Sequence, residues 1–174
     1  MTLKILILAL ATLPISKEDR PVTPAKKAEM DQVAASVFKY SEGNLEVMAM
    51  TLMLGQHESA FSSRIGRSEC KPKECDPRRV KGKLEHRARG FWQLHKNGLS
   101  DAEWAALHGP GTIDAQAKEA VRRVRSAFAT CRGEPDWPRA AIAQYAGAGC
   151  RGAHKLKDMN ARVKTYSQVR RFIP

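Results

Sequence analysis

A carboxylic acid directly follows an apolar stretch near the middle of the chain. The segment from Leu45 to His57 is apolar nearly all round, and Glu58 stands where such a helix would emerge from a protein core. Burial disfavours the charged form of a carboxyl group, so we expect Glu58 to hold a proton and to serve as a general acid. The alternative is a solvated glutamate at a helix C-terminus, where the helix dipole disfavours negative charge.

Two later segments offer polar and aromatic side chains that can work beside this acid. They are Ala88-Arg-Gly-Phe-Trp-Gln-Leu94 and Ala141-Ile-Ala-Gln-Tyr-Ala-Gly147. Amide and phenol groups can hydrogen-bond to a ligand or to the acid, and aromatic rings offer apolar faces. The alternative for each side chain is a partner within the core. The residues concerned are Phe91, Gln93, Gln144 and Tyr145.

In this order, the three segments resemble the signature motifs of the soluble lytic transglycosylase family and its goose-type lysozyme relatives. The family's Glu-Ser pair at the end of a core helix is matched by Glu58-Ser59. Its Gly-hydrophobic-Met-Gln run is matched by Gly90-Phe-Trp-Gln93, with Trp92 in place of Met. Its Ala-x-Tyr-Asn-Ala-Gly run is matched by Ala143-Gln-Tyr-Ala-Gly147, where Ala146 replaces the Asn. The resemblance covers roughly residues 30–149.

The resemblance implies a lysozyme-like fold and cleavage of the β-1,4 bond between N-acetylmuramic acid and N-acetylglucosamine in peptidoglycan, without a cofactor or a metal. It implies that Glu58 is the catalytic acid and base, and that Ser59 supports the N-acetyl or peptide side of the substrate. Gln93 and Tyr145 would line the cleft. Because the family's Asn is missing, Gln144 would help to position the substrate, and Phe91 would offer its ring to a sugar.

The number of carboxyl groups distinguishes two reactions. In a lytic transglycosylase one carboxyl group is enough, because the substrate's own hydroxyl attacks. An inverting hydrolase needs a second carboxylate about 6.5–9.5 Å away to activate water. Glu85, shortly before the second motif, is our candidate for that second carboxylate; the alternative is an ion pair with neighbouring Arg and Lys residues.

Helices must position these residues. Apolar residues recur at helical spacing over 28–41, 45–57 and 113–131, and again after Asp136 and around Met159. No strand alternation is evident, so we expect an all-α fold. Between Ser62 and Gly90 the periodicity gives way to Arg, Lys, Pro and Gly, and we expect an irregular basic loop there.

We divide the chain into residues 1–24, an apolar segment with a linker, and residues 25–174, one lysozyme-like catalytic domain with a basic C-terminal helix. The run from Ile5 to Leu13 is apolar and follows a single Lys, as in a weak secretory signal. It is too short to span a bilayer. A first core helix is the alternative.

Four cysteines form an even set that allows three pairings. We favour Cys70–Cys75, which closes a small loop with a proline, and Cys131–Cys150, which ties together the segments on either side of one helix. The alternatives are a zinc site that uses the first pair with two histidines, and free buried thiols. Disulfides would imply an extracytoplasmic location.

The chain is strongly basic. Its 30 Lys and Arg against 18 Asp and Glu give a net charge of +12. This balance favours a polyanionic partner, and we expect a monomer that binds peptidoglycan and the anionic bacterial envelope. Nucleic acid is the less favoured partner, because the basic clusters lack interleaved aromatic residues. The alternative function is a non-catalytic, basic protein that binds nucleic acid or glycan on the same fold.

Overall fold

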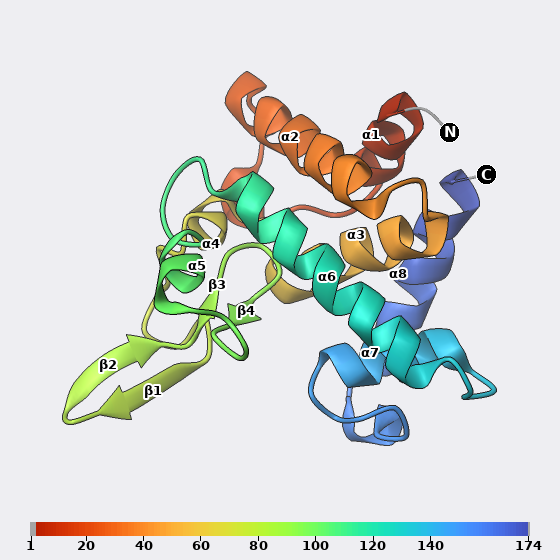
Figure 1. The fold of residues 1–174 in the computed structure, drawn as a ribbon. Helices are drawn as coiled ribbons and strands as arrows, with labels where there is room; N and C mark the ends of the chain where they lie inside the picture. Colours follow the sequence, from red (N-terminus) through yellow and green to blue (C-terminus); the bar gives the residue numbers. More distant parts are fainter. Residues whose placement is uncertain (1–2, 174) are drawn as a thin grey trace.

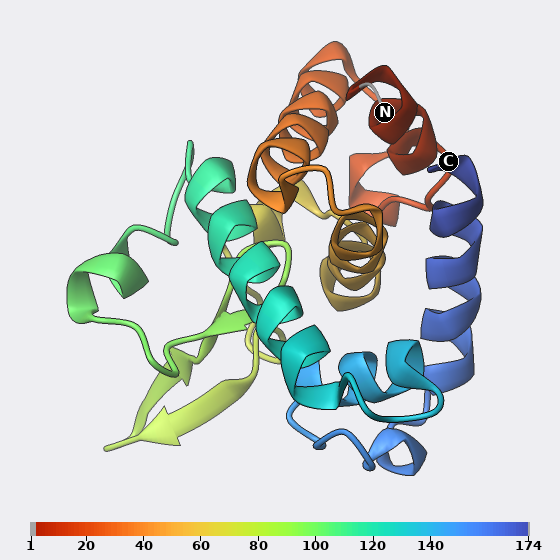
Figure 2. The ribbon, with the colours of Figure 1, turned by 45° about the vertical axis from the view of Figure 1, so that its right-hand side comes forward.

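A buried helix, α3 (Leu45–Ser59), runs through the centre of the protein in the computed structural model, which describes residues 3–173. Other helices surround it, as Figure 2 shows where α3 is seen nearly end-on. Asn44 caps its start by accepting a hydrogen bond from the Val47 amide at 3.0 Å. Because α3 is covered on all sides, its sequence lacks the polar stripe of a surface helix.

The surrounding helices confirm the predicted helical class. α2 (Pro24–Ser41), α6 (Ile113–Cys131) and α8 (Met159–Phe172) pack against α3, and α7 (Trp137–Tyr145) packs against α6 and α8. Thr23 caps α2 by accepting from the Lys26 amide at 3.1 Å, so the helix begins earlier than the apolar spacing predicted. The short helices are η1 (Lys17–Asp19), α4 (Ser63–Gly66), α5 (Asp101–Ala105) and η2 (Ala153–Lys155).

The basic segment after α4 is not the irregular loop that we expected. Strands β1 (Pro77–Val80) and β2 (Lys83–His86) form an antiparallel hairpin that projects from the helical body (Figure 1). Lys81 and Gly82 both have positive φ, as the two-residue turns of tight hairpins require. Strand alternation was absent from the sequence because neither face of this hairpin is buried. A smaller ladder joins β3 (Ala88–Arg89) to β4 (Leu94–His95).

The N-terminal apolar segment forms α1 (Leu3–Ala11), which packs against α2 and α8. Leu6, Ala9 and Leu10 are buried there, so this segment contributes to the hydrophobic core. In this structure the segment is a helix of the core, the second of our two alternatives for it, and the signal hypothesis stays a prediction. None of the helices within residues 3–173 is both long and apolar enough to cross a membrane.

Both predicted disulfides are present. Cys70–Cys75 lies at the base of the hairpin, with its Cα atoms 6.0 Å apart. Cys131–Cys150 joins the end of α6 to the loop after α7, with its Cα atoms 5.5 Å apart. The first bond takes both thiols that the alternative zinc site would have used.

Candidate functional site

An open cleft with a volume of about 480 Å³ lies beside the C-terminal end of α3. It brings together Glu58, Gln93 and Tyr145, one residue from each of the three segments that the sequence singled out. Further lining residues come from the hairpin base, the segment after β3, α6 and α8. Those with charged or polar side chains are Asp76, His95, Asn97, Arg123 and Arg162.

Glu58 is the acid that ends α3, and it has a basic partner. Arg162 Nη1 donates to its Oε1 at 2.6 Å, while Arg162 Nε donates to Asp158 at 2.7 Å. Burial opposes the charge of Arg162, but the two carboxylates outweigh it, so the pKa of the guanidinium lies above its usual value. The surroundings of Glu58 are therefore not the purely apolar ones that we expected, because Arg162 lies against its carboxyl group. The Glu58 side chain is 21% exposed, so the cleft reaches it.

The backbone turns sharply after this acid. Ala60 and Phe61 have φ of +48° and +50°, in the left-handed region. Ser59 is buried, and its hydroxyl donates to the Gly55 carbonyl at 3.0 Å and accepts from the Phe61 amide at 3.1 Å. The structure thus places Ser59 outside the cleft, where it shapes the helix end, and not beside a substrate as the resemblance implied.

Gln93 reaches the cleft because the two residues before it are anchored in the core. Phe91 is fully buried and packs edge-on against Phe61, with ring centroids 5.8 Å apart. The Trp92 indole donates to the Thr51 carbonyl of α3 at 2.8 Å. The prediction that Phe91 offers its ring to a sugar is wrong, since no part of that ring is accessible.

Gly90 allows this turn to approach α6 closely. Its φ is +70°, and a Cβ atom there would lie 2.1 Å from Oε1 of Gln116. That oxygen instead accepts from the Phe91 amide at 3.1 Å. The backbone N–H group of Gln93 closes the turn by donating to the Gly90 carbonyl at 3.1 Å. The glycine of the second segment is therefore a packing requirement.

Tyr145 ends α7, and its hydroxyl donates to the Trp92 carbonyl at 3.2 Å. Burial raises the pKa of Tyr145, and nearby Glu58 raises it further, so the phenol remains a neutral donor at physiological pH. This hydrogen bond joins the second and third segments. Gln144, the preceding residue, does not line the cleft, and the structure therefore gives it no role in positioning a ligand there.

The structure does not place Glu85, our candidate for a second carboxylate, in the cleft. Glu85 is exposed on β2, opposite Arg78, and is not among the cleft residues. Asp76 lines the cleft instead, 2.7 Å from Arg87 Nη2 and 3.7 Å from His95 Nδ1. Our candidate for a second carboxylate was therefore wrong. A sequence signal for Asp76 existed in the adjacent Cys75, whose disulfide holds this position against the body.

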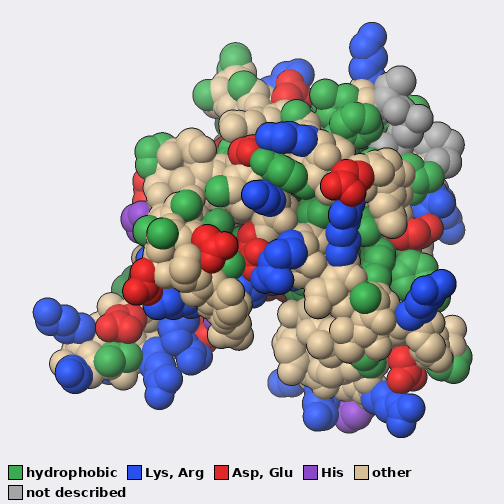
Figure 3. Space-filling view, viewed as in Figure 1, with side chains coloured by type: hydrophobic (Ala, Val, Ile, Leu, Met, Phe, Trp, Pro, Cys, Tyr) green, Lys and Arg blue, Asp and Glu red, His purple; other side chains and the backbone are tan. Residues whose placement is uncertain are grey.

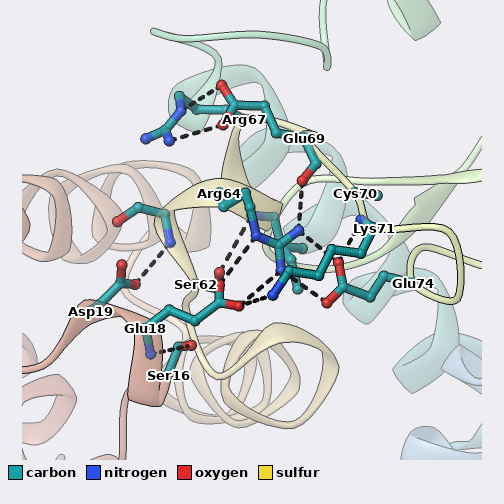
Figure 4. A network of polar contacts seen from close by, with 12 residues as sticks. Ser16, Glu18, Asp19, Ser62, Arg64, Arg67, Glu69, Cys70, Lys71 and Glu74 are labelled. Carbon is teal, nitrogen blue, oxygen red and sulfur yellow. Dashed lines mark hydrogen bonds and ion pairs between the residues drawn. The ribbon is translucent and has the colours of Figure 1, made fainter.

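An ion-pair network fixes the loop that carries Asp76 (Figure 4). The Arg64 guanidinium lies 2.6 Å from Glu74 and 3.1 Å from Glu18, and these acids raise its pKa above the usual value. Glu74 also accepts from the Lys71 amide at 2.7 Å. The network ties the Cys70–Cys75 loop to α4 and η1, so the hairpin base has a defined position beside the cleft.

The charged side chains of the cleft are balanced, with the acids Glu58 and Asp76 against Arg123 and Arg162. Burial lowers the pKa of His95 although Asp76 opposes this, so His95 is neutral at pH 7. Arg123 is held by Glu119, Nε to Oε1 at 2.6 Å, and donates to the His95 carbonyl. Sequence reasoning missed Arg123, which nothing distinguished from other arginines. It missed Arg162 too, although this residue shares the buried face of α8 with Met159 and Tyr166 at helical spacing.

No protein-family model, curated protein or solved structure matches this chain. Within residues 3–173, no group of three or more His, Cys, Asp or Glu side chains could hold a metal ion. The functional case therefore rests on the residues of the cleft.

Proposed function

We propose that the protein cleaves the glycan strands of peptidoglycan at the β-1,4 bond between N-acetylmuramic acid and N-acetylglucosamine, with Glu58 as general acid and base. One observation carries this proposal. Three short segments that are far apart in the sequence, and that together resemble the motifs of muralytic enzymes, contribute Glu58, Gln93 and Tyr145 to one cleft.

Two polar atoms in the cleft that have no hydrogen-bond partner among the described residues suit this chemistry. Oε1 of Glu58 accepts from Arg162, whereas Oε2 accepts no hydrogen bond from the described residues and is available to the glycosidic oxygen. Gln93 uses its amide nitrogen on the Gly90 carbonyl at 3.0 Å, which leaves its oxygen for a sugar hydroxyl or N-acetyl N–H group. Arg162 holds the acid in one orientation, and Tyr145 holds the turn that carries Gln93.

The cleft supports either of the two reactions. In either reaction, Arg162 orients the Glu58 carboxyl group through its hydrogen bond to Oε1. If water is the nucleophile, Asp76 replaces Glu85 as the base that activates it.

Digestion of purified peptidoglycan tests the proposal. We expect the wild-type protein to release muropeptides and Glu58→Gln to lose at least about a hundredfold in rate, since general acid catalysis contributes that much or more. Glu85→Gln is the matched control, because that acid lies outside the cleft, and it should retain full activity. Wild-type protein that leaves peptidoglycan intact across pH and salt, or a Glu58→Gln variant with full activity, would refute the assignment.

The products distinguish the reactions. Anhydro-muramyl ends identified by mass spectrometry would mean a lytic transglycosylase, and Asp76→Asn should then retain most activity. Reducing ends would mean a hydrolase, and Asp76→Asn should then be as inactive as Glu58→Gln. We further propose that the protein acts as a monomer outside the cytoplasm, where its two disulfides are stable.

The Glu58–Arg162 ion pair favours a second candidate, a protein that binds glycan without cutting it. A carboxylate neutralised by a permanent cation can serve the structure alone. In that case the wild-type protein would sediment with insoluble peptidoglycan and release no products, and Glu58→Gln would change neither behaviour.

A further inference from the structure

The β1–β2 hairpin carries a cluster of basic residues on its projecting part. The hairpin carries a single acid, Glu85, and four cations: Arg78, Arg79, Lys81 and Lys83. None of the four forms an ion pair with any residue in the described part of the chain. Basic residues nearby differ in this respect, since Arg87 pairs with Asp76 and Arg67 with Glu69. Figure 3 shows Lys and Arg side chains gathered over this projection.

The cations of the hairpin tip stand next to apolar side chains. Arg79 lies directly opposite Leu84, and Val80 lies directly opposite Lys83. Directly opposed residues share one face of a ladder, so each face of the tip carries one cation beside one apolar residue. Leu84 is 42% exposed, although leucine is usually buried. The hairpin thus presents charge and apolar surface together, at the point farthest from the helical body.

This combination matches the interface of a lipid bilayer. Apolar side chains enter the boundary between head groups and acyl chains, while Lys and Arg extend to the phosphates. A nucleic acid would use the cations but would leave Leu84 and Val80 without a partner. The hairpin also lacks aromatic residues on which bases could stack.

We propose that the hairpin tip docks on an anionic phospholipid bilayer. The base of the hairpin is pinned by the Cys70–Cys75 bond and by the Arg64 network, so the tip is presented in one orientation. Asp76 precedes β1 and Ala88 follows β2, and both line the cleft. Docking therefore holds the cleft close to the membrane surface. The proposal concerns a binding surface and does not depend on what reaction the cleft performs.

Sedimentation with vesicles tests this docking. We expect the wild-type protein to bind vesicles of phosphatidylglycerol and phosphatidylcholine, and not vesicles of phosphatidylcholine alone. The triple variant Arg79→Gln, Lys81→Gln, Lys83→Gln should bind about a hundredfold more weakly, since each cation near an anionic surface contributes about fivefold. All three side chains are exposed, so the variant should melt at the wild-type temperature.

A control of equal charge separates the hairpin from the overall charge. Lys155→Gln, Lys157→Gln, Arg171→Gln also removes three exposed cations, and we expect it to bind within about threefold of wild type because these residues lie away from the tip. Leu84→Ser should weaken binding several-fold without changing its salt dependence. Equal losses in both triple variants would overturn the proposal. So would wild-type protein that binds duplex DNA but no phosphatidylglycerol vesicles.

Discussion

Arg162 lies on the inner face of α8, and its guanidinium contacts the carboxylates of Glu58 and Asp158. Its side chain is 11% exposed, so solvent screens the contact with Glu58 only weakly. An arginine in this position connects the C-terminal helix to the end of α3, where the candidate acid stands. The residue therefore has a structural role that can be measured without any assay of activity.

Replacing Arg162 by Met should lower the free energy of unfolding by about 2–3 kcal/mol, because the mostly buried Glu58 carboxylate loses its partner. The matched control is Arg170→Met on the same helix. Its pair with Glu46 is about one-third exposed on each side, so the loss should be at most about 1 kcal/mol. Urea unfolding of both variants measures the difference, and equal losses would contradict this account of Glu58.

His57, the residue before the acid, should make stability depend on pH. Its Nε2 lies 3.0 Å from the Thr165 hydroxyl, and its Nδ1 lies 3.8 Å from Asp158. Burial lowers the pKa of His57 and Arg162 lowers it further, while Asp158 and Glu58 oppose the shift. Because the pKa of His57 is lowered in the folded protein, the unfolded chain takes up the proton at a higher pH than the folded protein does. Stability is therefore lost as the pH falls below about 6.5, the ordinary value for histidine.

We expect this proton to reduce the free energy of unfolding by up to about 1 kcal/mol between pH 7 and pH 5.5. His57→Gln should remove that part of the slope. His95, whose pKa is also lowered, contributes in the same direction and remains in both proteins as an internal reference. Urea unfolding at the two pH values measures the slopes; a variant as pH-sensitive as wild type would show that His57 titrates normally.

At the scale of elements, the turn after β3 carries a specific packing requirement. The side-chain oxygen of Gln116, in α6, accepts a hydrogen bond from the Phe91 amide. Its side-chain nitrogen donates to the Gly66 carbonyl at 2.7 Å and to the Thr112 hydroxyl at 2.8 Å. This buried amide joins the turn, α4 and the start of α6. A side chain at Gly90 would meet it and displace it.

Gly90→Ala should therefore cost about 3 kcal/mol, from the left-handed backbone and from the broken hydrogen bonds of a buried amide. Gly82→Ala is its control. Gly82 has the same backbone conformation, with φ of +78°, but no atom within 4 Å of the added carbon, so we expect about 1 kcal/mol. Thermal unfolding compares the two. On the proposed function, the Gly90 variant should also lose activity on peptidoglycan at temperatures where it is still folded, since Gln93 moves with the turn.

The whole molecule is closed by its two terminal segments, because α1 packs against both α2 and α8. Leu6 and Leu10 of α1 belong to the same core as Val169 and Ile173 at the other end of the chain. A protease that removed the apolar N-terminal segment would therefore uncover part of that core.

Leu6→Ala should lower the free energy of unfolding by about 3 kcal/mol, as expected when a fully buried leucine is truncated. Leu8→Ala on the same helix is the control: Leu8 is 63% exposed, and its loss should stay within about 0.5 kcal/mol. If both substitutions proved neutral, α1 would not be part of the cooperative unit.

The sequence by itself indicated the main helices, favoured the two disulfides that are present, and singled out Glu58, Gln93 and Tyr145 of the candidate cleft. Helical spacing is local, so a single segment contains all the information that it requires, although the Thr23 cap that starts α2 was overlooked. Of three possible pairings, we favoured the two that close a small loop with a proline and tie the segments on either side of one helix, and both are present. Glu58 stood out because a buried helix has an unmistakably apolar sequence.

Only the tertiary structure decided which side chains meet in the cleft. Periodicity records whether a segment is buried, but not which distant segment covers it, so Arg162 and Asp76 could not be assigned to Glu58's surroundings. For the same reason, Phe91 was expected in the cleft and lies in the core. The hairpin escaped prediction because strands exposed on both faces carry no alternation of polar and apolar residues.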